Sequence, residues 1–416
     1  MRFSLFVVFL FCLQYTLNKK GGEFVILPSY VEKAISILEE SGFEAYVVGG
    51  CVRNFLLNQK ICDYDLATSA TPAQIKEVFC DYKTIDTGIM HGTVTLFIDS
   101  IPLEITTFRK EGAYSDHRRP DSVTFSESLK SDLMRRDFTV NALAYNPKTG
   151  IIDLFGGQSD LEKYLLACVG DGDKRFEEDA LRILRAMRFM SQYSFVAEQN
   201  THNAMLKNYP ILCFVSKERI YEEFKKLLCG KNAKAVLKEY KKIVLFLLPS
   251  LGYDYVCTLN AVDSLPPDFT LRFCALFSSC EKNLAVEALN SLKADNKTIN
   301  TVKLLLENLS KPAESKLEIK KLLSSLGKEN LLSLFTLKEA LFSFNRENAL
   351  SLADKIIESG ECFSLSNLAV NGEDLSALGF KGKEIGAALK LLLDAVIEER
   401  LPNDFNKLIK YLKEQA

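Results

Sequence analysis

Tryptophan is absent from the 416-residue sequence, histidine occurs only three times, and no two cysteines have the C-x-x-C spacing. The histidines are His91, His117 and His202, which leaves little material for a histidine-based metal site or a Ser–His triad. The eleven cysteines are scattered, so the sequence favours neither a disulfide framework nor a zinc site. We therefore expect reduced thiols and a cytoplasmic location.

The sequence also lacks an excess of charge of either sign. Its formal net charge is −2, 47% of its residues are hydrophobic and 25% are charged. This composition is typical of a globular protein of about two to four domains, and it excludes a mainly disordered, collagen-like or polytopic membrane protein.

Long apolar runs are almost missing as well. The one exception, Phe3–Leu17, is shorter than the roughly 20 residues of a membrane span, and no convincing signal-peptidase site follows it. We expect no stable membrane association and set residues 1–24 apart from the fold. A location outside the cytosol through this segment stays open as an alternative.

Arginine, by contrast, is concentrated in one window. Nine of the fifteen arginines lie between Arg109 and Arg188. Guanidinium groups suit phosphates and base edges, so the window predicts a local anion-binding region that the balanced net charge conceals. A salt-bridged surface is the alternative that composition alone leaves open.

The pattern of apolar residues divides the chain into two kinds of structure. Strands, helices and a hairpin alternate up to about Asn146, at residues 31–38 (helix), 45–48 (strand), 51–57 (helix), 63–66 (strand), 72–79 (helix), and 92–98 with 103–108 (hairpin). After that point the pattern changes: residues 179–190 have helical spacing, and beyond Pro210 almost every segment does, including 233–248, 299–309, 317–326 and 385–397. This order predicts an α+β protein, with a small mixed-sheet head followed by an elongated all-α region.

The first group of candidate site residues surrounds the end of the first strand. Gly49 and Gly50 let the backbone approach a phosphate closely, and Arg53 adds a charged fork. Asp63 and Asp65 are two residues apart on a predicted strand, so their carboxylates share one face and repel each other unless a divalent cation lies between them. Mg²⁺ together with a nucleoside triphosphate fits this arrangement, with both aspartates as metal ligands and catalytic groups.

Two further positions extend this candidate site. Glu104, on the strand L-E-I-T-T-F, is a candidate third catalytic carboxylate, and a solvated strand face is its alternative. In the segment R-R-D-F-T-V-N-A, Arg136 is a candidate ligand of the triphosphate, while Asp137 and Asn141 could orient it or the ribose. A capped helix with an i,i+4 polar pair is the competing interpretation of these three residues.

The segment E-D-A-L-R-I-L-R-A-M-R provides a candidate site for base recognition. On the predicted helix Asp179 and Arg182 are neighbours at i,i+3, and they offer an acceptor beside a donor. That pair matches the Watson–Crick edges of cytosine and adenine and would repel guanine and uracil. Arg185 and Arg188 follow round the helix and could reach phosphate or a nucleic-acid strand. An intrahelical ion pair is the alternative for Asp179 and Arg182.

Taken together, these segments resemble the class II tRNA nucleotidyltransferases, which are the CCA-adding enzymes, and their bacterial poly(A) polymerase relatives. The motifs keep their order over about a third of the chain. They are YVVGGCVRNFLL (46–57), DYDLATSATP (63–72), HGTVT (91–95), EITTFR (104–109), RRDFTVNALA (135–144), DLFGGQSDL (153–161) and RFEEDALRILRAMRF (175–189).

The resemblance implies a nucleotidyltransferase (palm) head at 25–150, a neck with the base-recognition helix at 151–215, a helical body at 216–330 and a tRNA-binding helical tail at 331–416. It implies template-independent addition of CCA to the 3′ end of tRNA from CTP and ATP, with Mg²⁺ held by Asp63 and Asp65. In this family Gly50, Arg53 and Arg136 correspond to nucleotide-binding positions. Asp179 and Arg182 correspond to base-reading positions, which Arg185 and Arg188 assist. Residues 109–125 look like the family's flexible loop at full length, which favours addition of all three nucleotides.

One residue departs from the family's pattern. Asn54 stands where Gly-Gly-x-Val-Arg is usually followed by aspartate. The lost charge predicts weaker positioning of Arg53 and a lower rate. The sequence as a whole predicts a full CCA-adding enzyme. The alternatives are a bacterial poly(A) polymerase, a relative that adds only CC, and a catalytically weakened RNA-binding relative.

Overall fold

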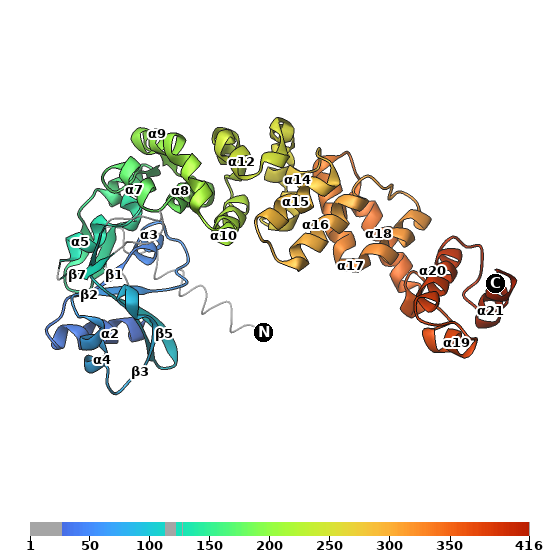
Figure 1. The fold of residues 1–416 in the computed structure, drawn as a ribbon, viewed down its shortest axis with the longest axis horizontal. Helices are drawn as coiled ribbons and strands as arrows, with labels where there is room; N and C mark the ends of the chain where they lie inside the picture. The colour runs from blue at the N-terminus through green and yellow to red at the C-terminus, as the bar shows by residue number, and fades with distance from the viewer. Residues whose placement is uncertain (1–26, 113–121, 127, 416) are drawn as a thin grey trace, which may run out of the picture. The chain divides into compact units, whose positions relative to one another are not determined.

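The computed structural model describes residues 27–112, 122–126 and 128–415 (Figure 1). The apolar segment 1–24 and residues 113–121 of the predicted loop lie outside the described residues. The chain divides into two compact units, with the boundary between Glu223 and Phe224. Within the described residues, no helix combines the length and apolarity needed to cross a membrane.

The first unit is built on a seven-stranded sheet in the order β3-β4-β5-β2-β1-β8-β9. Strands β2 and β5 are parallel, and every other neighbouring pair is antiparallel, so the sheet is mixed as predicted. The predicted hairpin is confirmed as β4 and β5. The strands are β1 (Ala45–Val48), β2 (Asp65–Thr68), β3 (Lys83–Gly88), β4 (Thr93–Ile98), β5 (Ile101–Thr107), β8 (Leu143–Asn146) and β9 (Gly150–Asp153).

The predicted helices of this unit are also present. Thr71 caps α4 through a reciprocal capping box with Gln74, and Pro72 occupies the first helical position. The helices are α2 (Ser29–Glu40), α3 (Gly50–Leu56), α4 (Pro72–Val78), α5 (Leu129–Met134), α6 (Gly157–Glu162), α7 (Gly172–Glu178), α8 (Leu181–Tyr193) and α9 (Gln199–Asn208). Small buried residues of β1, β2 and β8 pack with Phe108 and Leu133, which fixes the strand ends that carry the candidate site.

Two local predictions differ from the structure. Strand β2 begins at Asp65, so Asp63 precedes the strand instead of lying on it. Asp179 is not inside a helix: its backbone is extended, with φ −139° and ψ 101°, between α7 and α8. Its side chain accepts a hydrogen bond from the backbone N–H of Leu181 at 3.1 Å. Local bonds of this kind between an aspartate side chain and the backbone compete with the helical conformation.

The region after residue 150 is mainly, but not wholly, helical. Strand β9 ends at Asp153, and two short strands, β10 (Leu165–Leu166) and β11 (Val196–Ala197), pair in parallel. A further two-stranded ribbon in the first unit joins β6 (Arg109–Glu111) to β7 (Val123–Phe125). These strands are too short to alter the fold class, and they lie where the sequence shows no alternation long enough to detect.

The described residues of the second unit contain only helices and connecting turns (Figure 1). The predicted helix 233–248 is divided at Tyr240, and the predicted helix 317–326 is the first part of a longer one that is kinked at Gly327, whose φ is +72°. The helices, from the one that crosses the boundary onward, are α10 (Lys217–Leu228), α11 (Ala233–Glu239), α12 (Lys241–Leu247), α13 (Leu259–Ser264), α14 (Phe269–Leu276), α15 (Lys282–Ser291), α16 (Asn296–Asn308), α17 (Lys316–Leu341), α18 (Arg346–Glu358), α19 (Gly372–Ala377), α20 (Lys383–Ile397) and α21 (Phe405–Gln415).

Candidate active site

The candidate site residues meet in a cavity of about 710 Å³ in the first unit. Twelve of the thirteen residues selected from the sequence line it, and Glu104 is the exception. Four lining residues were not selected: Arg135, Leu181, Phe189 and Arg219. The complete lining is Gly49, Gly50, Arg53, Asp63, Asp65, Arg135, Arg136, Asp137, Asn141, Asp179, Leu181, Arg182, Arg185, Arg188, Phe189 and Arg219.

Gly49 brings the backbone close to one of the arginines. Its φ is +79°, and a Cβ atom at this position would lie 2.7 Å from Nη1 of Arg136, so only glycine fits. Arg136 is held from the other side by Asp132, whose carboxylate lies 3.2 Å from its Nη2 and 2.7 Å from Nη2 of Arg135. The Nε of Arg136 is buried and has no hydrogen-bond partner within the described residues, which leaves a donor for an anion in the cavity.

The three predicted carboxylates lie close together but only two line the cavity. Asp65 and Glu104 are in register on the parallel strands β2 and β5. The pKa of Asp65 is raised, first by partial burial and then by the Glu104 carboxylate, with Asp63 adding to the effect and Arg136 opposing it. No cluster of three or more metal-ligating side chains occurs in the described part of the chain.

A pair of carboxylates nevertheless fits a magnesium ion that is shared with a nucleotide. Mg²⁺ usually takes one or two protein carboxylates, and waters and substrate phosphates complete its shell. The pKa of Asp65 is raised first by burial and then by neighbouring carboxylates, and a divalent cation would favour its charged form against both. Asp63 and Asp65 therefore suit this ion, while Glu104 flanks them.

Arg53 is held by neutral groups although it is buried. Its guanidinium stacks on the rings of Phe189 and Tyr193, at 4.9 and 4.6 Å from their centroids. It donates to the amide oxygens of Asn141 and Asn54 and to the Tyr193 hydroxyl. The amide of Asn54 thus retains contact with Arg53, in contrast to the weaker positioning expected from the missing aspartate.

Phe189 is the centre of the arginine cluster. Besides Arg53, the guanidinium groups of Arg185 and Arg188 lie over this ring, at 5.4 and 4.4 Å from its centroid. The ring attracts each of the three cations, which holds their guanidinium groups at the cavity wall. The i,i+4 spacing of Arg185 and Phe189 on α8 was the only signal in the sequence for this arrangement.

Asp137 joins α8 to the segment that precedes β8. Its carboxylate accepts from Nε and Nη2 of Arg185 at 2.8 and 2.6 Å, from the Asn141 amide at 2.9 Å and from the N–H of Phe138 at 2.9 Å. Burial alone would raise its pKa, but Arg185 and Asn141 outweigh burial and hold the pKa at about 2. The i,i+4 polar pair between Asp137 and Asn141 is present, whereas the continuous helix expected around it is not.

Asp179 and Arg182 line the same cavity but do not pair with each other. Asp179 accepts from Nη2 of Arg219 at 2.9 Å, and Arg182 bonds to Glu178 at 2.7 Å and to the carbonyl oxygen of Arg135 at 3.0 Å. The intrahelical ion pair between Asp179 and Arg182 is therefore absent, because Asp179 precedes the helix. Arg219, on α10, could not be linked to Asp179 by any spacing in the sequence.

The charge of the cavity differs from that of the whole chain. Seven arginines and four aspartates line it, while the chain as a whole has a net charge of −2. Low-dielectric walls focus the electric field of these arginines into the cavity, so a bound anion experiences a strong positive potential. The cavity is suited to a polyanion that also brings groups for Asp179 and for the Asp63–Asp65 pair.

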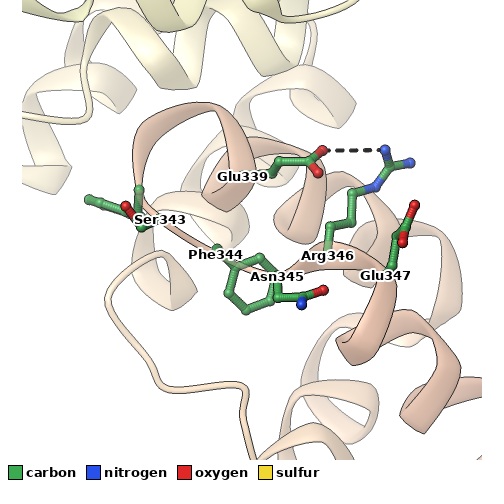
Figure 2. Close-up of a pocket in the computed structure, with 7 residues that line it drawn as sticks. Glu339, Ser343, Phe344, Asn345, Arg346 and Glu347 are labelled. Atoms are coloured by element: carbon green, nitrogen blue, oxygen red, sulfur yellow. Dashed lines mark hydrogen bonds and ion pairs between the residues drawn. The ribbon is translucent and has the colours of Figure 1, made fainter.

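A second pocket lies at the turn between α17 and α18 in the other unit and has a volume of about 430 Å³ (Figure 2). Its one arginine, Arg346, lies 3.4 Å from Glu339, and Glu347 also lines the pocket. This balance of charge makes it a poor receptor for phosphate, so the cavity of the first unit remains the candidate active site.

The chain matches three family profiles along its length. Residues 45–167 match the poly A polymerase head domain. Residues 194–251 match an RNA- and SrmB-binding site of polymerase A, and residues 271–412 match tRNA nucleotidyltransferase domain 2.

Relatives resemble the chain over nearly its whole length. It is 39% identical over 391 residues to the CCA-adding enzyme of Lactobacillus delbrueckii subsp. bulgaricus, covering 90% of this chain and 95% of that enzyme. It is 40% identical over 405 residues to the CCA-adding enzyme of Limosilactobacillus fermentum, covering 92% and 97%. Its structure is similar to that of the Bacillus stearothermophilus CCA-adding enzyme in complex with CTP, with a TM-score of 0.79, 31% identity, and coverage of 94% and 98%.

Proposed function

The chain belongs to the family of CCA-adding enzymes, and we propose that its own reaction is the stepwise addition of two cytidylates and one adenylate to the 3′ end of tRNA. The substrates are CTP, ATP and a tRNA that lacks its terminal CCA. The observation that carries the proposal is the cavity that brings the Asp63–Asp65 pair to a cluster of seven arginines.

The family uses a divalent metal ion, and we assign Mg²⁺ to Asp63 and Asp65. Bound there with the triphosphate, it would polarise the α-phosphate and favour the deprotonated 3′-hydroxyl of the tRNA. In each addition the 3′-oxygen forms a bond to the α-phosphorus, and the bond to the β-phosphate breaks and releases pyrophosphate. Glu104 raises the pKa of Asp65 and flanks the pair, which supports a third, electrostatic role for it. Both aspartates open onto the cavity, where phosphate oxygens can complete the coordination shell.

The arginines of the cavity have different roles in binding the nucleotide. Arg53 and Arg136 lie beside Gly49 and Gly50. The Nε of Arg136, which has no hydrogen-bond partner among the described residues, supports their assignment to the triphosphate. Asp137 and Asn141 hold Arg185 and Arg53, so their part in nucleotide binding is to orient these two guanidinium groups. Arg188 pairs with Glu223 at 3.1 Å and adds to the positive field of the cavity.

Asp179 and Arg182 supply the selection between bases. A carboxylate accepts from the exocyclic amino group of cytosine or adenine, and a guanidinium donates to the adjacent ring nitrogen. Guanine and uracil present a carbonyl oxygen where the amino group is needed, so Asp179 repels them. The present partners of the two side chains, Arg219 and Glu178, must be exchanged for the base when a nucleotide enters.

We divide the chain into the head at 25–150, the neck at 151–215, the body at 216–330 and the tail at 331–416. The body and the tail are assigned to the tRNA acceptor arm, which they would bind by shape and phosphate contacts. All ten cysteines of the described residues are free, which supports a cytoplasmic location.

A poly(A) polymerase is the second candidate, because the head matches a profile that carries that name. One experiment separates the two: extension of a tRNA that ends at its discriminator base, with Mg²⁺ and one labelled nucleoside triphosphate at a time. We expect CTP alone to give two additions and ATP to give one more only after them. Long adenylate tails on any RNA would establish the poly(A) polymerase, and arrest after two cytidylates with both nucleotides present would establish the CC-adding relative.

The Asp65→Asn variant serves as the matched control. It keeps the shape of the side chain and removes the charge that we assign to the metal site, so incorporation should disappear while tRNA binding by gel shift is unchanged. Binding of tRNA by the wild-type chain without any incorporation would contradict the enzyme and favour an RNA-binding scaffold.

A further inference from the structure

Asn54 connects two parts of the candidate active site. Its side-chain oxygen accepts from Nε and Nη2 of Arg53 at 3.2 and 2.9 Å, and from the Tyr193 hydroxyl at 3.2 Å. Its side-chain nitrogen donates to the carbonyl oxygen of Lys60 at 3.3 Å. Lys60 belongs to the segment 57–64, which follows α3 and contains Asp63.

These contacts require an amide. A guanidinium and a hydroxyl need an acceptor on one side of residue 54, and the Lys60 carbonyl needs a donor on the other. Aspartate offers two acceptors, so one of its oxygens would face the Lys60 carbonyl oxygen at about the distance of the present hydrogen bond. The environment of residue 54 therefore matches asparagine better than the aspartate that the family's motif usually has.

The contacts also determine whether neighbouring groups neutralise the charge of Arg53. Its three hydrogen-bonding side chains, Asn54, Asn141 and Tyr193, are all neutral, and only 6% of the residue is exposed. Asp137, the carboxylate that acts on Arg53 from a distance, is already paired with Arg185. A buried cation that its neighbours do not neutralise raises the free energy of the protein while the cavity is empty. An anion that enters the cavity pairs with this cation and removes that cost.

We propose that Asn54 is a positioning residue of the nucleotide site: its amide holds Arg53 at the cavity without neutralising it and ties the segment that carries Asp63 to α3. The full charge of Arg53 is then available to the phosphates of the incoming nucleotide. The inference rests on the proposed function only in taking those phosphates to be those of CTP and ATP.

The decisive variant is Asn54→Asp, which is nearly isosteric and places a carboxylate in contact with Arg53. We expect the Kd for CTP, ATP and inorganic triphosphate, measured by isothermal titration calorimetry, to rise about tenfold in each case, because the new carboxylate neutralises Arg53. The ratio of the CTP and ATP constants should not change, since Asn54 does not face the base. The melting temperature should change little, because the ion pair gained with Arg53 is offset by the lost hydrogen bond to the Lys60 carbonyl oxygen.

Two further variants separate positioning from charge. Asn54→Ala leaves the charge of Arg53 and removes both tethers, so kcat should fall about tenfold while the nucleotide Kd rises less than in Asn54→Asp. Tyr193→Phe removes one hydroxyl and keeps the stacked ring, so its Kd for inorganic triphosphate should rise about two- to threefold. Asn300→Asp, the same change at an exposed position of α16, is the control and should alter none of these values.

The outcomes are distinct from those that test the proposed function. A nucleotide Kd within twofold of the wild type in Asn54→Asp, or tighter binding, would overturn the inference whether or not the chain extends tRNA. Should Asn54→Asp fail to fold, unchanged kcat and Kd in Asn54→Ala would overturn it equally. Absence of incorporation by the wild-type chain would refute the enzyme and leave the Kd comparison decisive for Asn54.

Discussion

Two buried arginines, Arg53 in the first unit and Arg272 in the second, show how the same side chain serves different ends. Each is 6% exposed, and burial lowers the pKa of each guanidinium. Within the described residues, neither donates to a carboxylate. Arg272 donates to four backbone carbonyl oxygens, those of Leu228, Gly230, Leu265 and Pro266, at 2.6–3.3 Å. Arg53 instead has neutral side chains and aromatic rings as partners and lines a cavity.

The difference indicates what each charge is for. The donors of Arg272 are used by carbonyl groups from the end of α10 and the turn before α14. This arginine therefore links these two segments and has no donor available for a ligand. The partners of Arg53 fix its position and leave its charge available. Burial and pKa alone do not distinguish the two residues, whereas the identity of their partners does.

Replacement of Arg53 should have the largest effect on activity. We expect Arg53→Met to lower kcat/KM for CTP and ATP addition on the order of 100- to 1,000-fold, because a preorganised donor to the phosphates is lost. Stability should change little, since a buried charge disappears and the Asn141 amide oxygen that loses its donor belongs to a residue that lines the cavity, where water can replace it. Steady-state extension assays together with calorimetric melting measure both quantities. Wild-type kinetics in this variant would show that Arg53 is structural, like Arg272.

Replacement of Arg272 should show the reverse. Arg272→Met leaves four buried carbonyl oxygens without their donor, and we expect a loss of about 3 kcal/mol in the free energy of unfolding. Nucleotide Kd values should stay at wild-type levels below the unfolding temperature, because the cavity lies in the other unit. Urea denaturation and calorimetric titration test the two halves of this prediction. A weakened nucleotide Kd in folded protein would contradict the division between the two arginines.

The sequence predicted the parts of the site that depend on local order along the chain. The Gly49-Gly50 turn after a buried strand, the spacing of Asp63 and Asp65, and the order of the motifs led to the mixed-sheet head and to twelve residues of one cavity. These features are fixed by strand period, glycine stereochemistry and helix start signals, which act over a few residues.

The partners of those residues could not be predicted. Arg219 meets Asp179 across 40 positions, and Tyr193 meets Arg53 across 140, so only the tertiary fold brings them together. Asp179 also lies between two helices instead of inside one, where its side chain accepts from the backbone N–H of Leu181. By contrast, Asp132 lies three and four residues before Arg135 and Arg136, a helical spacing that the sequence does display.

The two units can also be compared by the pH dependence of stability, because each contains a carboxylate with a strongly lowered pKa. Asp137 in the cavity has a pKa of about 2, mainly because Arg185 outweighs the effect of burial. Because this pKa lies below the ordinary value of 3.8, its stabilising contribution is complete above about pH 4 and disappears as the pH falls toward 2. We expect Asp137→Asn to cost about 2 kcal/mol at pH 7, with a difference from wild type that shrinks over this window. Urea titrations at pH 7, 4 and 2.5 provide the measurement, and a difference independent of pH would refute the assignment.

Glu361 in the second unit also has a pKa of about 2, and its replacement should have the smallest effect. Burial would raise this pKa, but Glu361 contacts Lys316 at 2.6 Å and also the buried Lys320, which outweigh burial. Its side chain is 26% exposed, and Lys320 keeps a second carboxylate, Glu399, at 3.4 Å. Solvent screening and this substitute partner reduce the expected cost of Glu361→Gln to about 1 kcal/mol, lost between about pH 4.5 and 2. Glu361 and its lysine partners do not line the nucleotide cavity, so the nucleotide Kd should be unchanged. A weaker Kd in Glu361→Gln would mean that ionic contacts of the second unit also serve the cavity, and that partner identity does not separate structural from ligand-binding charges.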